Sequence, residues 1–201
     1  MDNIDLRVLK TLENIDSSLL GLLTRMPFHK ITVDMICKEA RINRSTFYKY
    51  YFDKYDLLDK YLEKVLKELQ VNIRPNFIEA SPEQLMDKRY SDEFMQILDF
   101  FWARRYPYQV LWHAVIDRHI YNEMIEIIQQ QLMAKLDKDT LKNPQKNSFA
   151  MLYSFLFANN LMSTVHWWYQ YNKEMSKEDV RRLMDDNMRM GLFKSFKQKI
   201  D

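Results

Sequence analysis

The stretch NRSTFYKYYFDK, residues 43–54, combines aromatic, cationic and hydroxyl-bearing side chains and contains no Gly or Pro. Its apolar residues are spaced too irregularly for a simple core helix. Asn43 can cap a short helix that runs to about Tyr50, and Asp53 can cap the helix that follows. The segments on either side of this stretch therefore decide how it folds.

A second short helix is predicted just upstream, because Thr32 is a good N-cap and is followed by apolar residues at i, i+3, i+4 and i+7. These residues are Val33, Ile36, Cys37 and Ala40. The helix breaks at Arg41 and Ile42. Longer amphipathic helices are predicted before it, over about 5–25, and after it, up to Pro75. Two short helices with a tight turn, braced by a longer helix on each side, describe a helix-turn-helix.

The short helix predicted after Asn43 carries side chains suited to DNA on its outward faces. Those side chains are Arg44, Ser45, Thr46, Lys49 and Tyr50. Phe47 is expected to anchor inward, and Tyr48 offers a hydroxyl to a phosphate oxygen. Lys54 adds its charge to the free N–H groups of a helix start, which favours a second phosphate. The alternative is that the tyrosines pack in the core and the cations form a solvated rim.

Charge is distributed unevenly along the chain. The net charge of the 201 residues is +2, but residues 25–54 hold seven Lys or Arg against three acids, so this segment carries +4 and the remainder −2. A basic segment on a slightly acidic body is expected of a module that approaches a polyphosphate.

Composition predicts a soluble, all-α, cytoplasmic protein. Gly and Pro are few, at two and five residues, and the single cysteine, Cys37, excludes an intramolecular disulfide. The sequence has no amino-terminal secretion signal and no run of 18 apolar residues. It also lacks a Gly-rich phosphate loop, a Cys–His pair or a nucleophile elbow, so we expect no catalytic residues and no enzyme activity.

We expect about nine helices in three parts: a helix-turn-helix domain at 1–54, a connecting helix at 55–76, and a larger helical domain at 77–201. Within the larger domain, the pattern predicts helices at 82–103, 107–118, 119–137, 145–171 and 177–198. Pro107 marks one expected break, and Ser176 with Asp179 an expected cap.

The segment TVDMICKEARINRSTFYKYYFDKYDLLDKYLEKV, residues 32–65, resembles the amino-terminal domain of the tetracycline-repressor (TetR) family of bacterial transcriptional regulators. The resemblance covers about residues 8–66 without a gap. It implies contacts to phosphates or bases from eight residues: Thr32, Arg44, Ser45, Thr46, Tyr48, Lys49, Tyr50 and Lys54. Arg41 departs from the family pattern, which usually has Gly there to suit a left-handed conformation.

The resemblance also implies a homodimer whose interface is formed by the last two long helices. Residues 149–171 are apolar on nearly every face, and such a helix must be enclosed by its own domain and by something more. The candidate interface residues are Phe157, Leu161, Val165, Trp168, Leu183 and Leu192. An intramolecular bundle that absorbs all of them is the alternative.

Four residues of the middle helices, Trp102, Tyr106, Trp112 and His113, are candidates to line a cavity for a flat or amphipathic effector. Core packing is the alternative for each. His113 and Asp117 are four residues apart, but two ligands without a third do not make a metal site, and we expect no metal or cofactor.

Together these observations predict a transcriptional regulator that binds a near-palindromic DNA operator as a homodimer and represses until a small-molecule effector releases it. The alternative is a helical protein that binds a small molecule or a protein partner and whose helix-turn-helix no longer binds DNA.

Overall fold

The computed structural model describes residues 6–79, 88–136, 141–171, 174–187 and 191 of the chain, and this part is helical with no strand. The all-α fold expected from composition is confirmed. The nine α-helices of the described part are α1 (Leu6–Leu23), α2 (Val33–Ala40), α3 (Arg44–Tyr48), α4 (Lys54–Asn72), α5 (Lys88–Ala103), α6 (Arg105–His113), α7 (Ile120–Met133), α9 (Pro144–Tyr171) and α10 (Lys177–Asn187). Two 3-10 helices are η1 (Phe28–Lys30) and η2 (Asn76–Glu79).

The chain divides into two compact units. The first unit comprises residues 1–67 and 106–121, and the second comprises residues 68–105 and 122–201. The sequence-based division into 1–54, 55–76 and 77–201 stays a prediction. None of the described helices is both long and apolar enough to cross a membrane.

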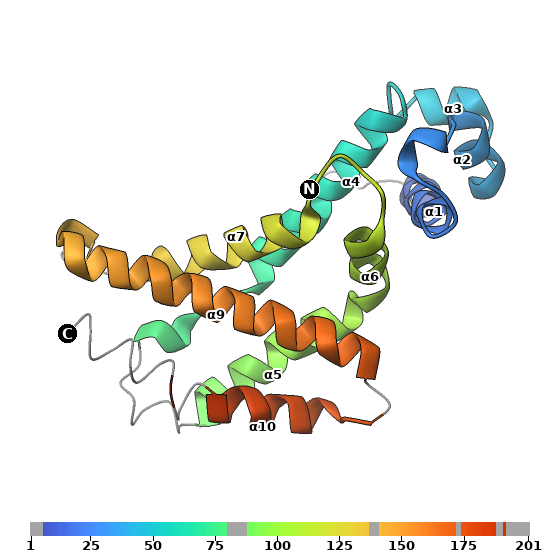
Figure 1. Ribbon diagram of the computed structural model, residues 1–201. Helices are drawn as coiled ribbons and strands as arrows, with labels where there is room; N and C mark the ends of the chain where they lie inside the picture. The colour runs from blue at the N-terminus through green and yellow to red at the C-terminus, as the bar shows by residue number, and fades with distance from the viewer. Residues whose placement is uncertain (1–5, 80–87, 137–140, 172–173, 188–190, 192–201) are drawn as a thin grey trace. The chain divides into compact units, whose positions relative to one another are not determined.

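In the first unit, helices α1, α2 and α3 gather beside the start of α4 (Figure 1). Their shared core is formed by fully buried side chains, namely Ile15, Leu19, Ile36, Phe47, Leu57 and Leu62. Two ion pairs at the edge of this core join neighbouring segments: Lys64 of α4 to Asp16 of α1 at 3.0 Å, and Arg25, just after α1, to Glu39 of α2 at 2.9 Å. The apolar stripes recognised in the sequence are therefore the faces that meet.

Helix α6 begins and ends earlier than expected. Pro107 is its third residue, and the break falls at Arg104, which separates α5 from α6. A proline in the first turn removes no helical hydrogen bond, because the N–H groups there have no partner within the helix. After His113 the backbone is irregular, and the carbonyl oxygen of Val115 accepts a 3.1 Å hydrogen bond from the N–H of Phe28. This bond ties the loop after α6 to η1 within the first unit.

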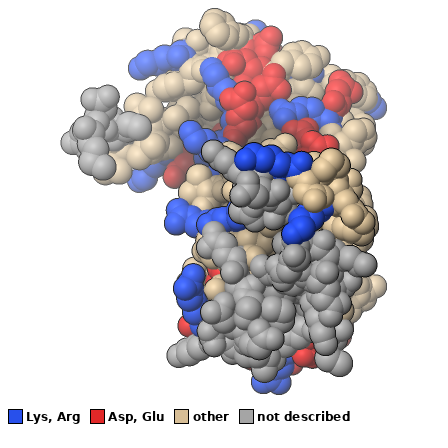
Figure 2. All heavy atoms as spheres, turned by 90° about the vertical axis from the view of Figure 1, so that its left-hand side faces the viewer, with Lys and Arg blue, Asp and Glu red and all other residues tan. Residues whose placement is uncertain are grey.

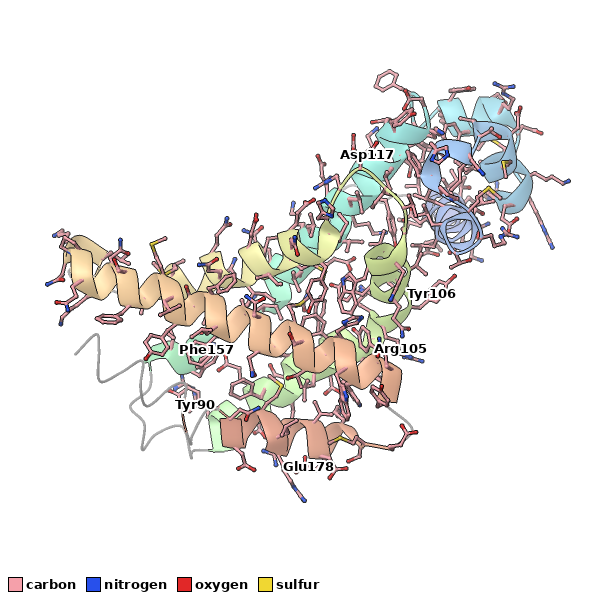
Figure 3. The ribbon with its side chains drawn as sticks, in the orientation of Figure 1. Tyr90, Arg105, Tyr106, Asp117, Phe157 and Glu178 are labelled. Atoms are coloured by element: carbon pink, nitrogen blue, oxygen red, sulfur yellow. The ribbon has the colours of Figure 1, made fainter. Side chains whose placement is uncertain are left out.

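The second unit is built around α9, which packs with α10, while α10 also packs on α5. Phe77 of η2 stacks on Phe94 with ring centroids 5.3 Å apart and meets Phe157 edge-on at 5.8 Å. Figure 3 shows Phe157 extending from α9 toward η2. The hydroxyl of Tyr169 donates a buried 2.6 Å hydrogen bond to the carbonyl oxygen of Phe101, which fixes α9 against the end of α5.

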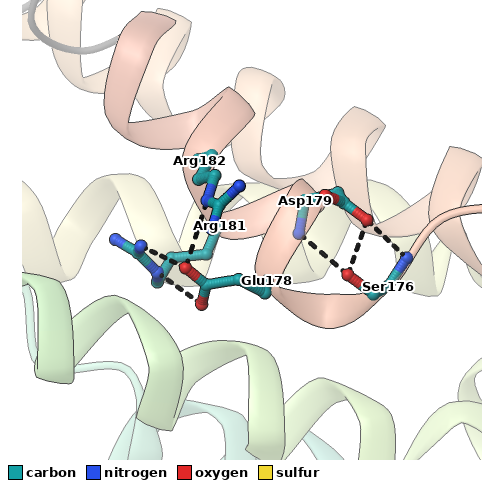
Figure 4. A network of polar contacts seen from close by, with 5 residues as sticks. All are labelled: Ser176, Glu178, Asp179, Arg181 and Arg182. Carbon is teal, nitrogen blue, oxygen red and sulfur yellow. Dashed lines mark hydrogen bonds and ion pairs between the residues drawn. The ribbon is translucent and has the colours of Figure 1, made fainter.

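Helix α10 begins with the cap expected from the sequence. The carboxylate of Asp179 accepts hydrogen bonds from the N–H and the hydroxyl of Ser176, at 3.1 and 2.6 Å (Figure 4). One residue earlier, Glu178 accepts hydrogen bonds from Arg181 and Arg182. Mainly because of the bond from Arg181, the pKa of Glu178 is lowered to about 2. These contacts define where α10 starts.

Candidate nucleic-acid interface

Charge alone does not locate a binding site on the face of the protein seen in Figure 2. Lys and Arg side chains are spread over the face seen in Figure 2, and acidic side chains lie among them. This mixture agrees with a net charge of only +2. The interface must therefore be built from the local geometry of α2, α3 and the turn between them.

Helix α2 is fixed at its start by Thr32, whose hydroxyl oxygen accepts a 3.2 Å hydrogen bond from the N–H of Met35. This is the N-cap predicted from the sequence. Ile36, Cys37 and Ala40 point into the core and are each at most 5% exposed. Because that face is buried, the opposite face of α2 remains available to a partner.

The turn after α2 depends on Arg41, which adopts φ 56° and ψ 44° in the left-handed region. The N–H of Ile42 donates back to the carbonyl oxygen of Cys37 at 3.0 Å, so the turn closes the end of the helix. A side chain in this conformation costs about 1–2 kcal/mol. The turn geometry expected from the sequence is thus present, with arginine bearing the strain that glycine would avoid.

We expect Arg41→Gly to stabilise the protein by about 0.5–1 kcal/mol, because relief of the left-handed strain exceeds the extra chain entropy of glycine in the unfolded state. Urea denaturation of the full chain measures the effect. Lys38→Gly, at an exposed position of α2 with ordinary helical geometry, is the matched control and should destabilise by about 0.5–1 kcal/mol. Destabilisation by both changes would contradict the strain at Arg41.

Helix α3 is only five residues long and is held down by Phe47, which is fully buried. The ring of Phe47 lies 5.5 Å from the rings of Tyr48 and Tyr51, between centroids. Asn43 occupies the N-cap position with an extended backbone, but its side chain makes no capping hydrogen bond. The inward anchor predicted at Phe47 is confirmed by its burial.

The other predicted residues of α3 and the turn after it lie outward to different degrees. Arg44, Ser45 and Lys49 are exposed, Tyr48 is 48% exposed, and Thr46 and Tyr50 are half-buried. The ammonium of Lys49 lies 5.7 Å from the ring centroid of Tyr50. Cations and hydroxyls are thus presented together by a short helix with a buried anchor.

Arg44 contacts side chains of both α2 and α3. Its guanidinium forms an ion pair with Asp34 at 3.2 Å and donates a hydrogen bond to the hydroxyl of Tyr48 at 3.3 Å. The hydrogen bond with Tyr48, followed by the charge of Asp34, raises the pKa of Arg44. Asp34, in the first turn of α2, is not among the site residues predicted from the sequence.

Lys54 has a different environment from the one expected. Its ammonium donates to three backbone carbonyl oxygens, those of Phe28 at 3.1 Å, His29 at 3.0 Å and Ile31 at 2.7 Å. An ammonium has three N–H donors, and all three are engaged here. This geometry assigns Lys54 to holding η1 against the start of α4 and leaves it no donor for the expected phosphate. Asp53 caps α4 as predicted, accepting from the N–H groups of Tyr55 and Asp56.

The four candidate effector residues do not share one environment. Trp102 belongs to the second unit, where it stacks on Trp168 at 4.7 Å, while Tyr106, Trp112 and His113 belong to the first. Tyr106 is 54% exposed and projects from α6 (Figure 3). Trp112 stacks on Tyr108 with centroids 5.9 Å apart. Trp102 and Trp112 therefore pack against other aromatic rings, whereas Tyr106 and His113 are exposed.

An apolar cavity lies instead in the second unit. It is lined by Ile73, Pro75, Phe77, Phe94, Ile97, Ile128, Leu132, Phe157, Asn160, Leu161 and Met184. Its volume is about 30 Å³, which is room for one or two water molecules. Asn160 is the polar side chain in this lining. A drug-sized ligand would have to push the surrounding helices apart.

Most of the residues expected at a dimer interface are buried within their own unit. Phe157, Leu161, Val165 and Trp168 are each at most 8% exposed, so they cannot also form the surface of a partner contact. Leu183 is 43% exposed, and Leu192 lies outside the described residues. The large apolar side chains that α9 leaves exposed are Met151, Leu152, Phe155, Leu156, Trp167 and Tyr171.

Comparison with known proteins gives a family match for the first part of the chain and structural matches for nearly all of it. Residues 20–61, which run from the end of α1 through η1, α2 and α3 into the first part of α4, match the family model TetR_N, described as "Bacterial regulatory proteins, tetR family". No curated protein matches the sequence.

Two solved structures are similar along almost the whole chain. One is a TetR transcriptional regulator from Streptococcus agalactiae 2603V, 19% identical, with a TM-score of 0.55 over 92% of this chain and 96% of that one. The other is the dihydroxyacetone kinase operon activator DhaS, 17% identical, with a TM-score of 0.55 over 94% of this chain and 97% of that one. At such identities the likeness shows the fold.

Proposed function

We propose that the chain is a member of the tetR family of bacterial regulatory proteins, namely a cytoplasmic, non-enzymatic transcription regulator that binds a near-palindromic DNA operator as a homodimer. In this proposal α3 enters the major groove, and α2 lies across the backbone. The helix-turn-helix of each protomer is called its head. The two heads of the dimer bind half-sites that are at least about 34 Å apart, which is one turn of the double helix.

The surface of α3 and the turn after it carries this proposal. Arg44, Ser45 and Lys49 are exposed above a fully buried Phe47, so the cations are displayed by a rigid element and not by a loose tail. Phosphates supply most of the affinity in such an interface, and side chains that reach base edges supply the discrimination. Thr32, Thr46, Tyr48 and Tyr50 complete the proposed DNA contacts.

The exposed apolar side of α9 supports the homodimer. Met151, Leu152, Phe155 and Leu156 recur at i, i+1, i+4 and i+5, so they share one face of the helix and are each at least 38% exposed. Monomeric proteins rarely leave such a contiguous apolar face in water. In a dimer whose two-fold axis passes through this face, the apolar face of one protomer would cover the same face of the other.

We further propose that the dimer represses, and that an apolar effector releases it by entering the cavity beside Phe157 and Asn160. Because that cavity is small, such an effector would favour a conformation with the surrounding helices spread apart. A reporter gene fused to the regulated promoter tests whether the protein represses or activates. Loss of the protein raises expression from a repressed promoter and lowers it from an activated one.

Lys49→Ala tests the DNA interface. The full chain is titrated against a duplex selected by the wild type from a random-sequence library, at several salt concentrations. We expect log affinity to fall steeply with log salt for the wild type, and Lys49→Ala to reduce the slope by about one per head, with about ten-fold weaker binding. Fluorescence anisotropy provides both quantities.

Lys67→Ala is the matched control, since it removes the same charge from an exposed position of α4. It should leave the slope unchanged. Failure of the wild type to bind any duplex at low salt would reject the proposed function and favour the helical interaction protein.

A further inference from the structure

An acidic residue lies beside Arg44 on the surface proposed to meet DNA. Asp34, in the first turn of α2, faces Arg44, the first residue of α3. One guanidinium nitrogen of Arg44, Nη1, lies 3.2 Å from Oδ1 and 3.4 Å from Oδ2 of Asp34. The other, Nη2, donates to the hydroxyl of Tyr48, and the guanidinium carbon lies 5.8 Å from the Tyr48 ring centroid.

This ion pair does little for folding. The side chains of Arg44 and Asp34 are 60% and 66% exposed, and exposed pairs of this kind contribute little to stability. The acid also repels the phosphates that the neighbouring cations attract. A carboxylate there weakens general affinity for DNA, so its benefit must lie elsewhere.

The geometry suggests that the benefit is orientation. A guanidinium has five N–H donors, and the contacts to Asp34 and Tyr48 engage its two terminal nitrogens while leaving other donors available. An arginine recognises guanine through two parallel hydrogen bonds, which require the guanidinium plane to be set. At 3.2–3.4 Å, the contacts are longer than the best charge-assisted hydrogen bonds, so they guide the side chain without locking it.

We propose that Asp34 is a positioning residue for DNA recognition, which holds the guanidinium of Arg44 toward a base edge and keeps it from pairing with the nearest phosphate. This inference rests on the proposed function. Without Asp34, a flexible Arg44 gains phosphate contacts on any sequence and loses its preferred orientation on the correct one. Asp34 therefore exchanges general affinity for discrimination between sequences.

Asp34→Ala separates these two quantities. We expect affinity for an unselected duplex to rise about three-fold per head, and the salt slope to increase by about one per head, because Arg44 becomes available to a phosphate. Preference at one base pair of each half-site should fall about five-fold, as part of one guanidinium–guanine contact is lost. Sequencing of duplexes selected by each variant from a random library measures the preference.

Glu39→Ala is the matched control. It removes an acid from the same helix and breaks an ion pair of 2.9 Å, but that pair is with Arg25 and involves no residue of α3. The preference profile of Glu39→Ala should equal that of the wild type. Circular dichroism of both variants confirms that the helices are retained.

A double variant decides whether Asp34 acts through Arg44. In an Arg44→Ala background, Asp34→Ala should change the preference profile no further. A change that persists there would overturn the proposal, because Asp34 would then contact a base itself. A wild-type profile for Asp34→Ala in a protein that binds DNA would also overturn it, yet leave the proposed function standing.

Discussion

Lys54→Ala should destabilise the first unit by about 2–3 kcal/mol and weaken DNA binding through loss of folded protein. The ammonium of Lys54 is the shared donor for three carbonyl oxygens of the segment 28–31, at 2.7–3.1 Å. Hydrogen bonds to a charged group contribute about 1.5–3 kcal/mol each. The expected loss is less than their sum, because water can reach the more exposed of these oxygens once the side chain is gone.

Hydrogen exchange of the full chain, followed on peptides from residues 26–32 and 52–58, localises the effect. Lys54→Met is the second variant, because it keeps the apolar stem beside the Phe28 ring, 4.9 Å from the ammonium, but removes the three donors. Lys60→Ala is the matched control: Lys60 also lies on α4, but it reaches one backbone carbonyl and the half-buried Asp56. It should cost at most about 1 kcal/mol.

The salt dependence distinguishes this role from the one expected for a lysine at a helix start. Under conditions in which Lys54→Met is folded, its slope of log affinity against log salt should equal that of the wild type. A slope reduced by about one per head, as expected for Lys49→Ala, would mean that Lys54 neutralises a phosphate. The structural assignment of its three hydrogen bonds would then be wrong.

The features that could be predicted from the sequence are those encoded by local spacing. Thr32, Asp53 and Ser176 cap the helices they were expected to cap, because a capping side chain reaches only two or three residues along the chain. The inward direction of Phe47 follows from helical periodicity in the same way. The break at Arg41 follows from the spacing of the two short helices, whereas its left-handed conformation was implied only by the resemblance to the TetR family.

The features that could not be predicted depend on residues brought together by folding. Lys54 meets carbonyls 23 to 26 positions away, through a 3-10 helix that has no periodic signature. Arg44 meets Asp34 across two helices, and the crossing geometry fixes that contact. Near α6, the sequence predicts a break at Pro107, but a proline is tolerated in the first turn of a helix, and the sequence did not show that α6 begins at Arg105.

The side of helix α9 that faces the core could not be predicted from the sequence either. Residues 149–171 are apolar on nearly every side, so periodicity alone could not tell which side faces the helix's own unit. The structure turns Phe157, Leu161, Val165 and Trp168 inward and leaves Leu152 and Phe155 outside. A glutamate at Leu161 or Trp168 would therefore disrupt the core and reveal nothing about a second copy.

In the proposed homodimer, Phe155→Glu is expected to separate the two protomers and give a monomer. Phe155 is 48% exposed beside Met151, Leu152 and Leu156, so the unit itself should tolerate the change. In a two-fold interface each substitution occurs twice, and each carboxylate would be buried without a partner. An unpaired buried charge costs about 3–5 kcal/mol, which raises the dissociation constant of the dimer by at least about 100-fold.

Sedimentation velocity measures the mass, and circular dichroism verifies that the helices remain. Asn122→Glu is the matched control, because it adds the same carboxylate at an exposed position in the first turn of α7, where an acid is favourable. That variant should sediment as the wild type does. A folded Phe155→Glu protein that still sediments as a dimer would move the interface away from this face of α9.

DNA binding then tests whether the dimer is the form that reads the operator. A monomer can occupy one half-site but loses the second head, whose binding to the same duplex is an intramolecular step in the dimer. Phe155→Glu should therefore weaken binding to a selected full site by a factor of about 100 or more, and binding to a half-site duplex hardly at all. Equal losses on both duplexes would indicate damage to the head, whereas a loss confined to the full site ties recognition by α3 to the exposed side of α9.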